Sequence, residues 1–163
     1  MKEVYSRLYV GGDPDYLKVA DDPDWRVVRA AKDGPGGHRE MLDYKERSAP
    51  KGPNYLFVER PRKLILNVVD SNDPNFYPDP LVDKALSYIS DSLRLGHKTL
   101  VCCNHGQSRG PSLTFLWLYM NGKLPAEYHR ALRQFRQAYP AYSPSDGIRQ
   151  YVKSRILAAK HKR

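Results

Sequence analysis

The chain has 163 residues, a length that suits one domain with a substantial hydrophobic core. Hydrophobic residues make up 40% of it, but no run of them is long enough to cross a bilayer, which excludes a membrane-spanning protein and predicts a soluble globular one. The formal net charge of +9 favours an acidic partner, such as a phosphorylated protein, nucleic acid or anionic lipid, or else reflects a solvated surface rich in lysine and arginine.

The N-terminus and the cysteines bear on where the protein works. Residues Met1–Tyr5 contain no apolar signal core, which argues against secretion. Cys102 and Cys103 are adjacent and do not make a disulfide framework, and a reactive thiol suits a reducing compartment. We therefore expect a cytoplasmic protein, with residues 158–163 forming a basic tail at a solvated helix end.

The first part of the chain is dominated by short β-rich runs. Four segments are candidate strands: Ser6–Gly11, Trp25–Ala30, Tyr55–Val58 and Leu64–Val69. Asp13–Ala20 between the first two is a turn or a short helix, and Pro61–Lys63 is a turn that joins the last two as neighbours.

Residues 32–53 form a long connection that is punctuated by glycine and proline, with a helical turn between His38 and Glu46. A connection of this length in a small domain is usually functional or disordered. One interpretation is a basic flap, carrying Lys32, His38 and Arg39 beside an anion site. The alternative, which we favour, is a variable insertion at the surface of a single domain that spans residues 1–163.

The second part of the chain is predominantly helical. Apolar residues recur at helical spacing through Leu81–Leu95, and Gly96 stops that helix. Pro111–Asn121 is apolar nearly all round and predicts a buried helix. Two further helices are expected, one from Pro125 to Pro140 and one that begins at Ser143–Gly147. Together these elements predict an α/β domain with a central mixed or parallel sheet flanked by helices.

The most informative stretch is Val101–Gly110. The apolar run Thr99–Cys102 before it predicts a buried strand, so the stretch is a strand-to-helix turn. Such a turn directs backbone N–H groups and a helix N-terminus at one point, which makes an anion site. Cys103 loses its proton easily in that field and becomes a nucleophile, while Arg109 can grip two phosphate oxygens. These residues predict a thiolate held beside a bound phosphate.

The pattern Cys103-x-x-Gly106-x-x-Arg109 resembles the signature of the cysteine-dependent protein tyrosine phosphatases, and the compact chain resembles their dual-specificity branch. The preceding strand, the central Gly and the following helix make the match specific, and the resemblance covers most of the chain outside residues 32–53. It implies a phosphatase-type phosphate-binding loop between a strand and a helix. The substrate-binding positions that it implies, mainly through backbone N–H groups, are Asn104, His105, Gly106, Gln107, Ser108 and Gly110. Gly106 would permit the backbone turn, and the side chain of His105 either faces away or reaches substrate at the rim.

Phosphate transfer to a thiolate requires that the departing oxygen be protonated, and a carboxylic acid is the usual donor. Asp70 stands at the end of an apolar strand and opens a loop, which resembles the position of the family's general acid. Asp73 on the same loop is the second candidate. Either residue can instead serve as a turn former.

The sequence departs from the family pattern on both sides of the Cys–Arg motif. Cys102 stands where the family usually has a His that orients the loop, and Gly110 stands where it usually has a Ser or Thr that helps the thiolate leave. The next hydroxyls are those of Ser108 and Ser112, so we expect slow turnover of the cysteinyl-phosphate intermediate. Cys102 is either a small core residue, which we favour, or a thiol that captures an oxidised Cys103.

The leading hypothesis is a metal-independent phosphomonoesterase that works through a cysteinyl-phosphate intermediate, with Cys103 as nucleophile, Arg109 as phosphate clamp and Asp70 as general acid. A phosphorylated protein is its expected substrate, and no cofactor is expected. A zinc site at Cys102, Cys103 and His105 lacks the usual ligand spacing. Two alternatives remain: a phosphatase for RNA 5′ phosphates or phosphoinositides, and a phosphate-binding pseudophosphatase with little turnover.

Overall fold

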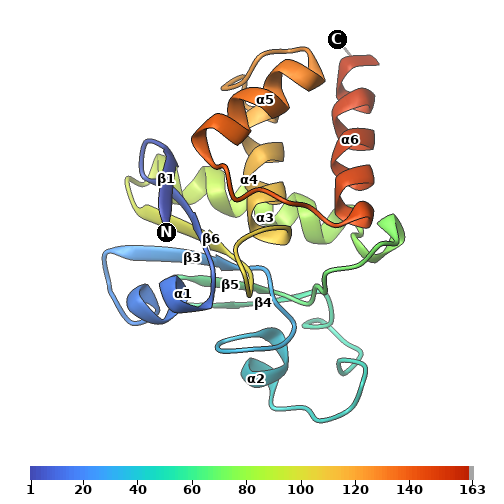
Figure 1. Ribbon diagram of the computed structural model, residues 1–163. Coiled ribbons are helices and arrows are strands. Elements are labelled where there is room, and N and C mark those ends of the chain that lie inside the picture. The colour runs from blue at the N-terminus through green and yellow to red at the C-terminus, as the bar shows by residue number, and fades with distance from the viewer. Residues whose placement is uncertain (162–163) are drawn as a thin grey trace.

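Residues 1–161 are described by a computed structural model of the chain. A six-stranded sheet lies between two unequal layers (Figure 1). Four helices cover one face: α3 (Asp79–Arg94), α4 (Arg109–Met120), α5 (Tyr128–Ala138) and α6 (Asp146–His161). The other face carries the short α1 (Asp13–Val19), and the 32–53 segment with α2 (His38–Leu42) projects beyond it. This arrangement confirms the predicted α/β class.

The sheet is mixed. Its order is β1 (Lys2–Tyr5), β2 (Leu8–Gly11), β6 (Lys98–Cys102), β3 (Trp25–Arg29), β5 (Lys63–Leu66) and β4 (Phe57–Arg60). The four central strands are parallel, and the two edge strands pair antiparallel with their neighbours. The carboxyl ends of the parallel strands therefore lie at one edge of the sheet, which is where α/β proteins bind ligands.

Strand β1 differs from the sequence-based expectation. The predicted strand Ser6–Gly11 is confined to β2, because Ser6 and Arg7 form the turn of a hairpin and Arg7 has a φ of 65°. The polar segment Lys2–Tyr5 pairs with β2 across this turn. Its β structure comes from pairing at the edge of the sheet, since its own hydrophobic pattern is weak.

The strand predicted over Leu64–Val69 ends at Leu66. Beyond it, the carbonyl of Val68 accepts hydrogen bonds from the N–H of Lys32 (2.9 Å) and from Nη1 of Arg109 (3.1 Å). These groups take the place of a neighbouring strand, so the chain leaves the sheet and carries Asp70 over its edge.

The helices follow the predicted order, with small shifts at their ends. Helix α5 begins after Glu127, whose carboxylate accepts the N–H groups of His129 and Arg130, rather than at Pro125. Helix α6 continues to His161, so the first residues of the expected basic tail are helical, and Lys162 and Arg163 lie outside the described residues. None of the described helices is long and apolar enough to cross a membrane.

The main core lies between the sheet and α3–α6. Nearly every side chain of α4 is buried there, which confirms the predicted buried helix, and the Phe115 ring packs at a tilt against the rings of Phe135 and Tyr142. A smaller cluster on the other face joins Tyr16 of α1 to Cys102 and its strand neighbours. The loop after β6 is thus supported by packed side chains on both faces.

The 32–53 segment is ordered by its own polar contacts. His38 is fully buried, with its ring nitrogens 2.9 Å from the Tyr44 hydroxyl and 2.7 Å from the Asn54 carbonyl. Burial lowers the pKa of His38, so the ring is neutral at physiological pH. Arg39 pairs with Asp33 at 2.7 Å. His38 and Arg39 therefore hold this segment together instead of forming a basic flap.

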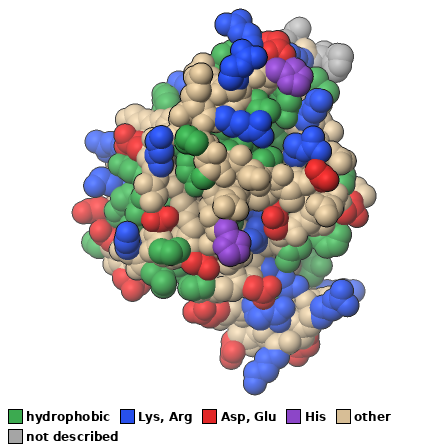
Figure 2. Space-filling view, in the orientation of Figure 1, with side chains coloured by type: hydrophobic (Ala, Val, Ile, Leu, Met, Phe, Trp, Pro, Cys, Tyr) green, Lys and Arg blue, Asp and Glu red, His purple; other side chains and the backbone are tan. Residues whose placement is uncertain are grey.

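The positive charge is distributed over several regions. Figure 2 shows Lys and Arg side chains over the α5 end of one face and on the projecting 32–53 segment, where Asp and Glu lie among them. On α5, Arg130, Arg133 and Arg136 supply part of this charge. The described surface therefore presents separate basic regions on this face.

Candidate active site

A small cavity opens at the carboxyl edge of the parallel strands. It is lined by Asp70, Cys103, His105, Gln107, Ser108, Arg109 and Ser143 and has a volume of about 60 Å³. Because a water molecule occupies about 30 Å³, this space is comparable to that of a small oxyanion such as phosphate. The structure thus brings the three predicted catalytic residues to one cavity.

The loop between β6 and α4 is held from outside through its carbonyl oxygens. The carbonyl of Asn104 accepts the N–H of Asp13, and that of Gln107 accepts the N–H of Ser143. The carbonyl of Gly106 accepts the hydroxyl of Tyr139. Within residues 1–161, the backbone N–H groups of residues 104–108 donate no hydrogen bond to the protein. The loop therefore presents unpaired N–H groups beside Cys103, as an anion cradle requires.

Gly106 is needed for the path of this loop. Its φ is +70°, and a Cβ at this position would lie 2.9 Å from the carbonyl carbon of Gly11. A side chain would therefore be strained by the backbone conformation and would also collide with the end of β2. The positive φ and this close approach both favour glycine here, and the part of Gly106 in binding substrate stays a prediction.

Arg109 lies beneath the loop and is only 8% exposed. Its Nη1 donates to the Val68 carbonyl at 3.1 Å, and its Nη2 donates to Oδ1 of Asn104 at 2.7 Å. Its Nε is buried and has no hydrogen-bond partner among the described residues. A buried donor without a partner costs free energy, and an oxyanion in the cavity would satisfy it.

The two cysteines face opposite sides of the sheet. Cys103 belongs to the main core cluster, whereas Cys102 packs with Tyr16 and Val27 on the α1 side. Burial raises the pKa of Cys102 to about 12, although Arg29 beside it acts in the opposite direction. Cys102 is therefore a neutral thiol at physiological pH, in agreement with a small core residue.

Arg29, a residue that the sequence did not single out, lies directly behind Cys103, the predicted nucleophile. Its side chain is fully buried, and Nη1 donates to the carbonyl of Cys103 at 3.0 Å and lies 3.7 Å from the sulfur of Cys102. Although burial disfavours its charged form, Cys102 and Asp13 beside it raise the pKa of Arg29. A guanidinium from β3 thus braces the segment where the family pattern has a His.

Asp13 connects this guanidinium to the rest of the loop. It pairs with Arg29 and accepts a hydrogen bond from Nδ2 of Asn104 at 3.2 Å. The same Nδ2 group donates to the carbonyl of Asp33 at 2.9 Å, and Arg29 Nε donates to that of Pro35 at 2.9 Å. The start of the 32–53 segment is therefore bonded to the loop between β6 and α4 and to Arg29 behind it.

The two candidate acids have different surroundings. Oδ1 of Asp70 accepts hydrogen bonds from the hydroxyls of Ser108 (2.7 Å) and Ser145 (2.6 Å), while Oδ2 has no partner in the described part of the chain. Asp73 accepts the N–H of Asn75 at 2.9 Å and caps a single 3₁₀ turn, Pro74–Phe76. Asp70 lines the cavity and Asp73 does not. Ser145 also was not predicted as a site residue, because the sequence indicates only its place at a helix start.

The residues around Arg109 offer few free hydroxyls. A Cβ on Gly110 would lie 3.2 Å from the carbonyl oxygen of Val101, so a side chain here would crowd the contact between α4 and β6. Ser112 is buried with its hydroxyl 2.8 Å from that of Tyr142, and Ser108 is bonded to Asp70. His105 and Gln107 are exposed at the mouth of the cavity.

This strand–loop–helix geometry has close counterparts among solved structures. Human DUSP28 aligns over 100% of both chains with a TM-score of 0.70 and 17% sequence identity. The chain has the dual-specificity phosphatase fold. The human tyrosine phosphatase-like serine/threonine/tyrosine-interacting protein (TM-score 0.67, 16% identity, 98% of this chain and 97% of that one) has the same fold. So does the Cydia pomonella phosphatase PTP-2 (TM-score 0.66, 15% identity, 94% and 88%). No protein-family model and no curated protein matched the sequence.

Proposed function

We propose that this protein is a cysteine-dependent phosphomonoesterase. The observation that carries the proposal is the small cavity lined by Cys103 and Arg109, where the buried Nε of Arg109 and the loop N–H groups have no hydrogen-bond partner within residues 1–161. The similarity in fold to dual-specificity phosphatases supports the same reaction class.

In the first step, the Cys103 thiolate attacks phosphorus and the bond from phosphorus to the ester oxygen breaks. Arg109 and the loop N–H groups stabilise the charge on the equatorial oxygens of the transferring group. Asp70 gives its proton to the departing oxygen, so an alcohol or phenol leaves and a cysteinyl-phosphate remains. The hydroxyls of Ser108 and Ser145 fix Oδ1 of Asp70, which leaves Oδ2 to carry this proton.

In the second step, water attacks the cysteinyl-phosphate. The Asp70 carboxylate accepts a proton from the water, inorganic phosphate forms and the Cys103 thiolate is released. Because Gly110 has no hydroxyl and Ser112 is bonded to Tyr142, neither assists the departing sulfur. We therefore propose that hydrolysis of the cysteinyl-phosphate limits the rate. If this hydrolysis is extremely slow, the protein acts as a phosphate-binding pseudophosphatase with little turnover.

The direct test is phosphate release from p-nitrophenyl phosphate without added metal, with Cys103→Ser as the matched control. Release by the wild type that the variant lacks supports the proposal, and a burst of nitrophenol before steady state would identify slow hydrolysis of the intermediate. Absence of release, with vanadate or phosphate still binding, would support the pseudophosphatase instead.

The substrate belongs to the same proposal. A phosphorylated protein is the class that the sequence resemblance favours, and RNA 5′ phosphates and phosphoinositides are the alternatives. A panel of phosphotyrosine peptide, triphosphorylated RNA and phosphoinositide would rank them by kcat/KM. We place this reaction in the cytoplasm, where a catalytic thiol stays reduced.

A further inference from the structure

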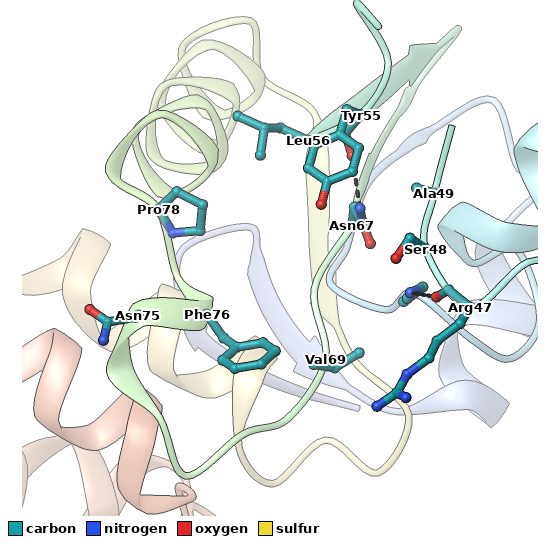
Figure 3. Close-up of a pocket in the computed structure, with 11 residues that line it drawn as sticks. Arg47, Ser48, Ala49, Tyr55, Leu56, Asn67, Val69, Asn75, Phe76 and Pro78 are labelled. Carbon is teal, nitrogen blue, oxygen red and sulfur yellow. Dashed lines mark hydrogen bonds between the residues drawn. The ribbon is translucent and has the colours of Figure 1, made fainter. Parts of the chain in front are cut away.

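A second and much larger cavity, about 610 Å³, lies between the 32–53 segment and the loop that follows β5 (Figure 3). Lys32, Arg47, Ser48 and Ala49 line it from the first side, and Asn75, Phe76 and Pro78 from the second. Tyr55, Leu56, Asn67 and Val69, which flank β4 and β5, complete its walls. Its volume falls in the range of sites for small molecules, about 300–1,000 Å³.

The two cavities are lined by consecutive residues of the loop that follows β5. Val69 lines the large cavity and Asp70 lines the small one, and the Cα atoms of consecutive residues are only about 3.8 Å apart. The small cavity is about the size of a phosphate group, so most of a larger substrate would lie outside it. The large cavity begins at the residue next to the proposed acid, so we infer that it receives the part of the substrate attached to the phosphate.

Two exposed aromatic side chains face this space. Tyr55 is 40% exposed and Phe76 is 53% exposed, although large hydrophobic side chains are usually covered. Figure 3 shows both rings directed into the cavity from different walls. Flat aromatic faces of this kind bind planar rings by stacking.

A fixed amide lies between these aromatic walls. Nδ2 of Asn67 donates to the carbonyl of Tyr55 at 2.9 Å, which orients the carboxamide. Its Oδ1 makes no hydrogen bond within the described residues and can accept one from a ligand. A heteroaromatic ring with an N–H group suits this position better than a hydrocarbon ring.

The charge of the cavity is positive. Lys32 and Arg47 line it, and none of its lining residues in the described chain is acidic. The Lys32 ammonium donates to the carbonyl of Arg47, and Arg39 donates to that of Glu46 at 2.6 Å, so the backbone under Arg47 is held in place. The guanidinium of Arg47 has no partner among residues 1–161 and extends toward Val69 in Figure 3. This arrangement suits a second anionic group on the ligand.

We propose that this cavity binds a nucleoside carrying two phosphates, with its base against Phe76 and Tyr55 and its second phosphate at Arg47 while the first phosphate reacts at Cys103. The inference rests on the proposed phosphatase function and narrows its substrate to a nucleotide. Two kinds of molecule present a nucleoside with two phosphates: a free nucleoside bisphosphate and the 5′-phosphorylated end of a nucleic acid.

The test compares kcat/KM for adenosine 3′,5′-bisphosphate, adenosine 5′-monophosphate, the 5′-phosphorylated dinucleotide pApA and a phosphotyrosine peptide. The two compounds with a second phosphate should exceed the monophosphate about tenfold, as one additional charged contact gives. A higher value for pApA than for the bisphosphate identifies a nucleic acid end as the source, and the reverse order identifies a free nucleotide.

Arg47→Ala should lower kcat/KM for the bisphosphate about tenfold relative to p-nitrophenyl phosphate. Phe76→Ala should lower the same ratio at least about fivefold, as loss of base stacking predicts. Lys51→Ala is the matched control, because it removes one positive charge from the same segment at an exposed residue outside the cavity. It should leave the ratio unchanged.

The inference is overturned if the wild type cleaves p-nitrophenyl phosphate but its kcat/KM for adenosine 3′,5′-bisphosphate and for pApA does not exceed that for adenosine 5′-monophosphate. It is also overturned if kcat/KM is highest for the peptide and Arg47→Ala leaves kcat/KM for the bisphosphate unchanged. If the wild type cleaves nothing, the proposed function fails, and calorimetric titration of adenosine 3′,5′-bisphosphate decides the inference separately. Binding that Arg47→Ala weakens and Lys51→Ala does not would support it, and absence of binding would overturn it.

Discussion

Replacing Arg29 by Met tests the bracing of the loop between β6 and α4, the proposed phosphate-binding loop. The substitution keeps an unbranched side chain and removes the guanidinium, which is fully buried and bonded to Asp13 and to the carbonyls of Pro35 and Cys103. These three acceptors then lose a charged donor together, and two of them are carbonyls of the segments that meet at the active site.

The magnitude follows from these contacts. Removing one partner of a buried ion pair costs about 3–5 kcal/mol. The Asp13 side chain is 31% exposed, so water recovers part of its solvation, while each unpaired carbonyl adds about 1 kcal/mol. We therefore expect a loss of about 3–5 kcal/mol from the free energy of unfolding, and since each kcal/mol shifts Tm by about 2–4 °C in a domain of this size, a Tm lower by about 6–20 °C.

Thermal and urea unfolding, followed by circular dichroism, measure this loss. Arg60→Met is the control, because Arg60 is exposed on the edge strand β4 and should change stability by less than about 0.5 kcal/mol. Activity measured well below both Tm values should also fall in Arg29→Met, since the carbonyl of Cys103 loses its donor. An Arg29→Met protein within about 1 kcal/mol of wild type would refute the bracing role.

Three further outcomes follow from the site and from the 32–53 segment. Asp70→Asn should slow hydrolysis of esters with poor leaving groups by about 10²–10⁴-fold, whereas Asp73→Asn should retain activity; the reverse order in steady-state assays would transfer the acid role to Asp73. Iodoacetamide at pH 7.5 should label Cys103 and spare Cys102, whose pKa of about 12 keeps it neutral, and peptide mass spectrometry that finds equal labelling would contradict this assignment. His38 has a lowered pKa, so its contribution to stability is present above the unfolded value of about 6.5 and is lost as pH falls through the folded value. Urea unfolding between pH 7 and 5 should therefore show a smaller loss of stability in His38→Asn than in wild type or in the exposed control His129→Asn, and identical slopes would exclude His38 as the cause.

The centre of the fold was predictable because its signals are local. A short apolar run, a motif with Gly106 at its middle and a long apolar run specify a strand, a turn and a helix within about twenty residues. Asp70 was placed as a candidate acid by its position after a strand, and the structure brings it to the same cavity as Cys103. Its assignment as the acid stays a prediction.

The parts that sequence analysis missed depend on contacts between distant segments. Arg29 follows two valines at the end of a strand, and a charged residue in this position is usually exposed to solvent. Only the pairing of β3 with β6 brings its guanidinium to the carbonyl of Cys103. Ser145 reaches Asp70 across 75 positions of sequence. His38 resembles a surface residue because Gly and Pro surround it, yet it is the buried centre of its segment.

The hydrogen bonds to the carbonyls of Asp33 and Pro35 limit which part of the 32–53 segment can be deleted or replaced. Its length suggests a piece that could be trimmed to obtain a minimal domain, but its first turn supplies the carbonyls that anchor Arg29 and Asn104. A deletion that begins at residue 32 would remove these anchors, whereas one restricted to the far end of the segment would retain them. For protein engineering, the usable boundary of this region therefore lies beyond Pro35, and shortening or grafting should begin there.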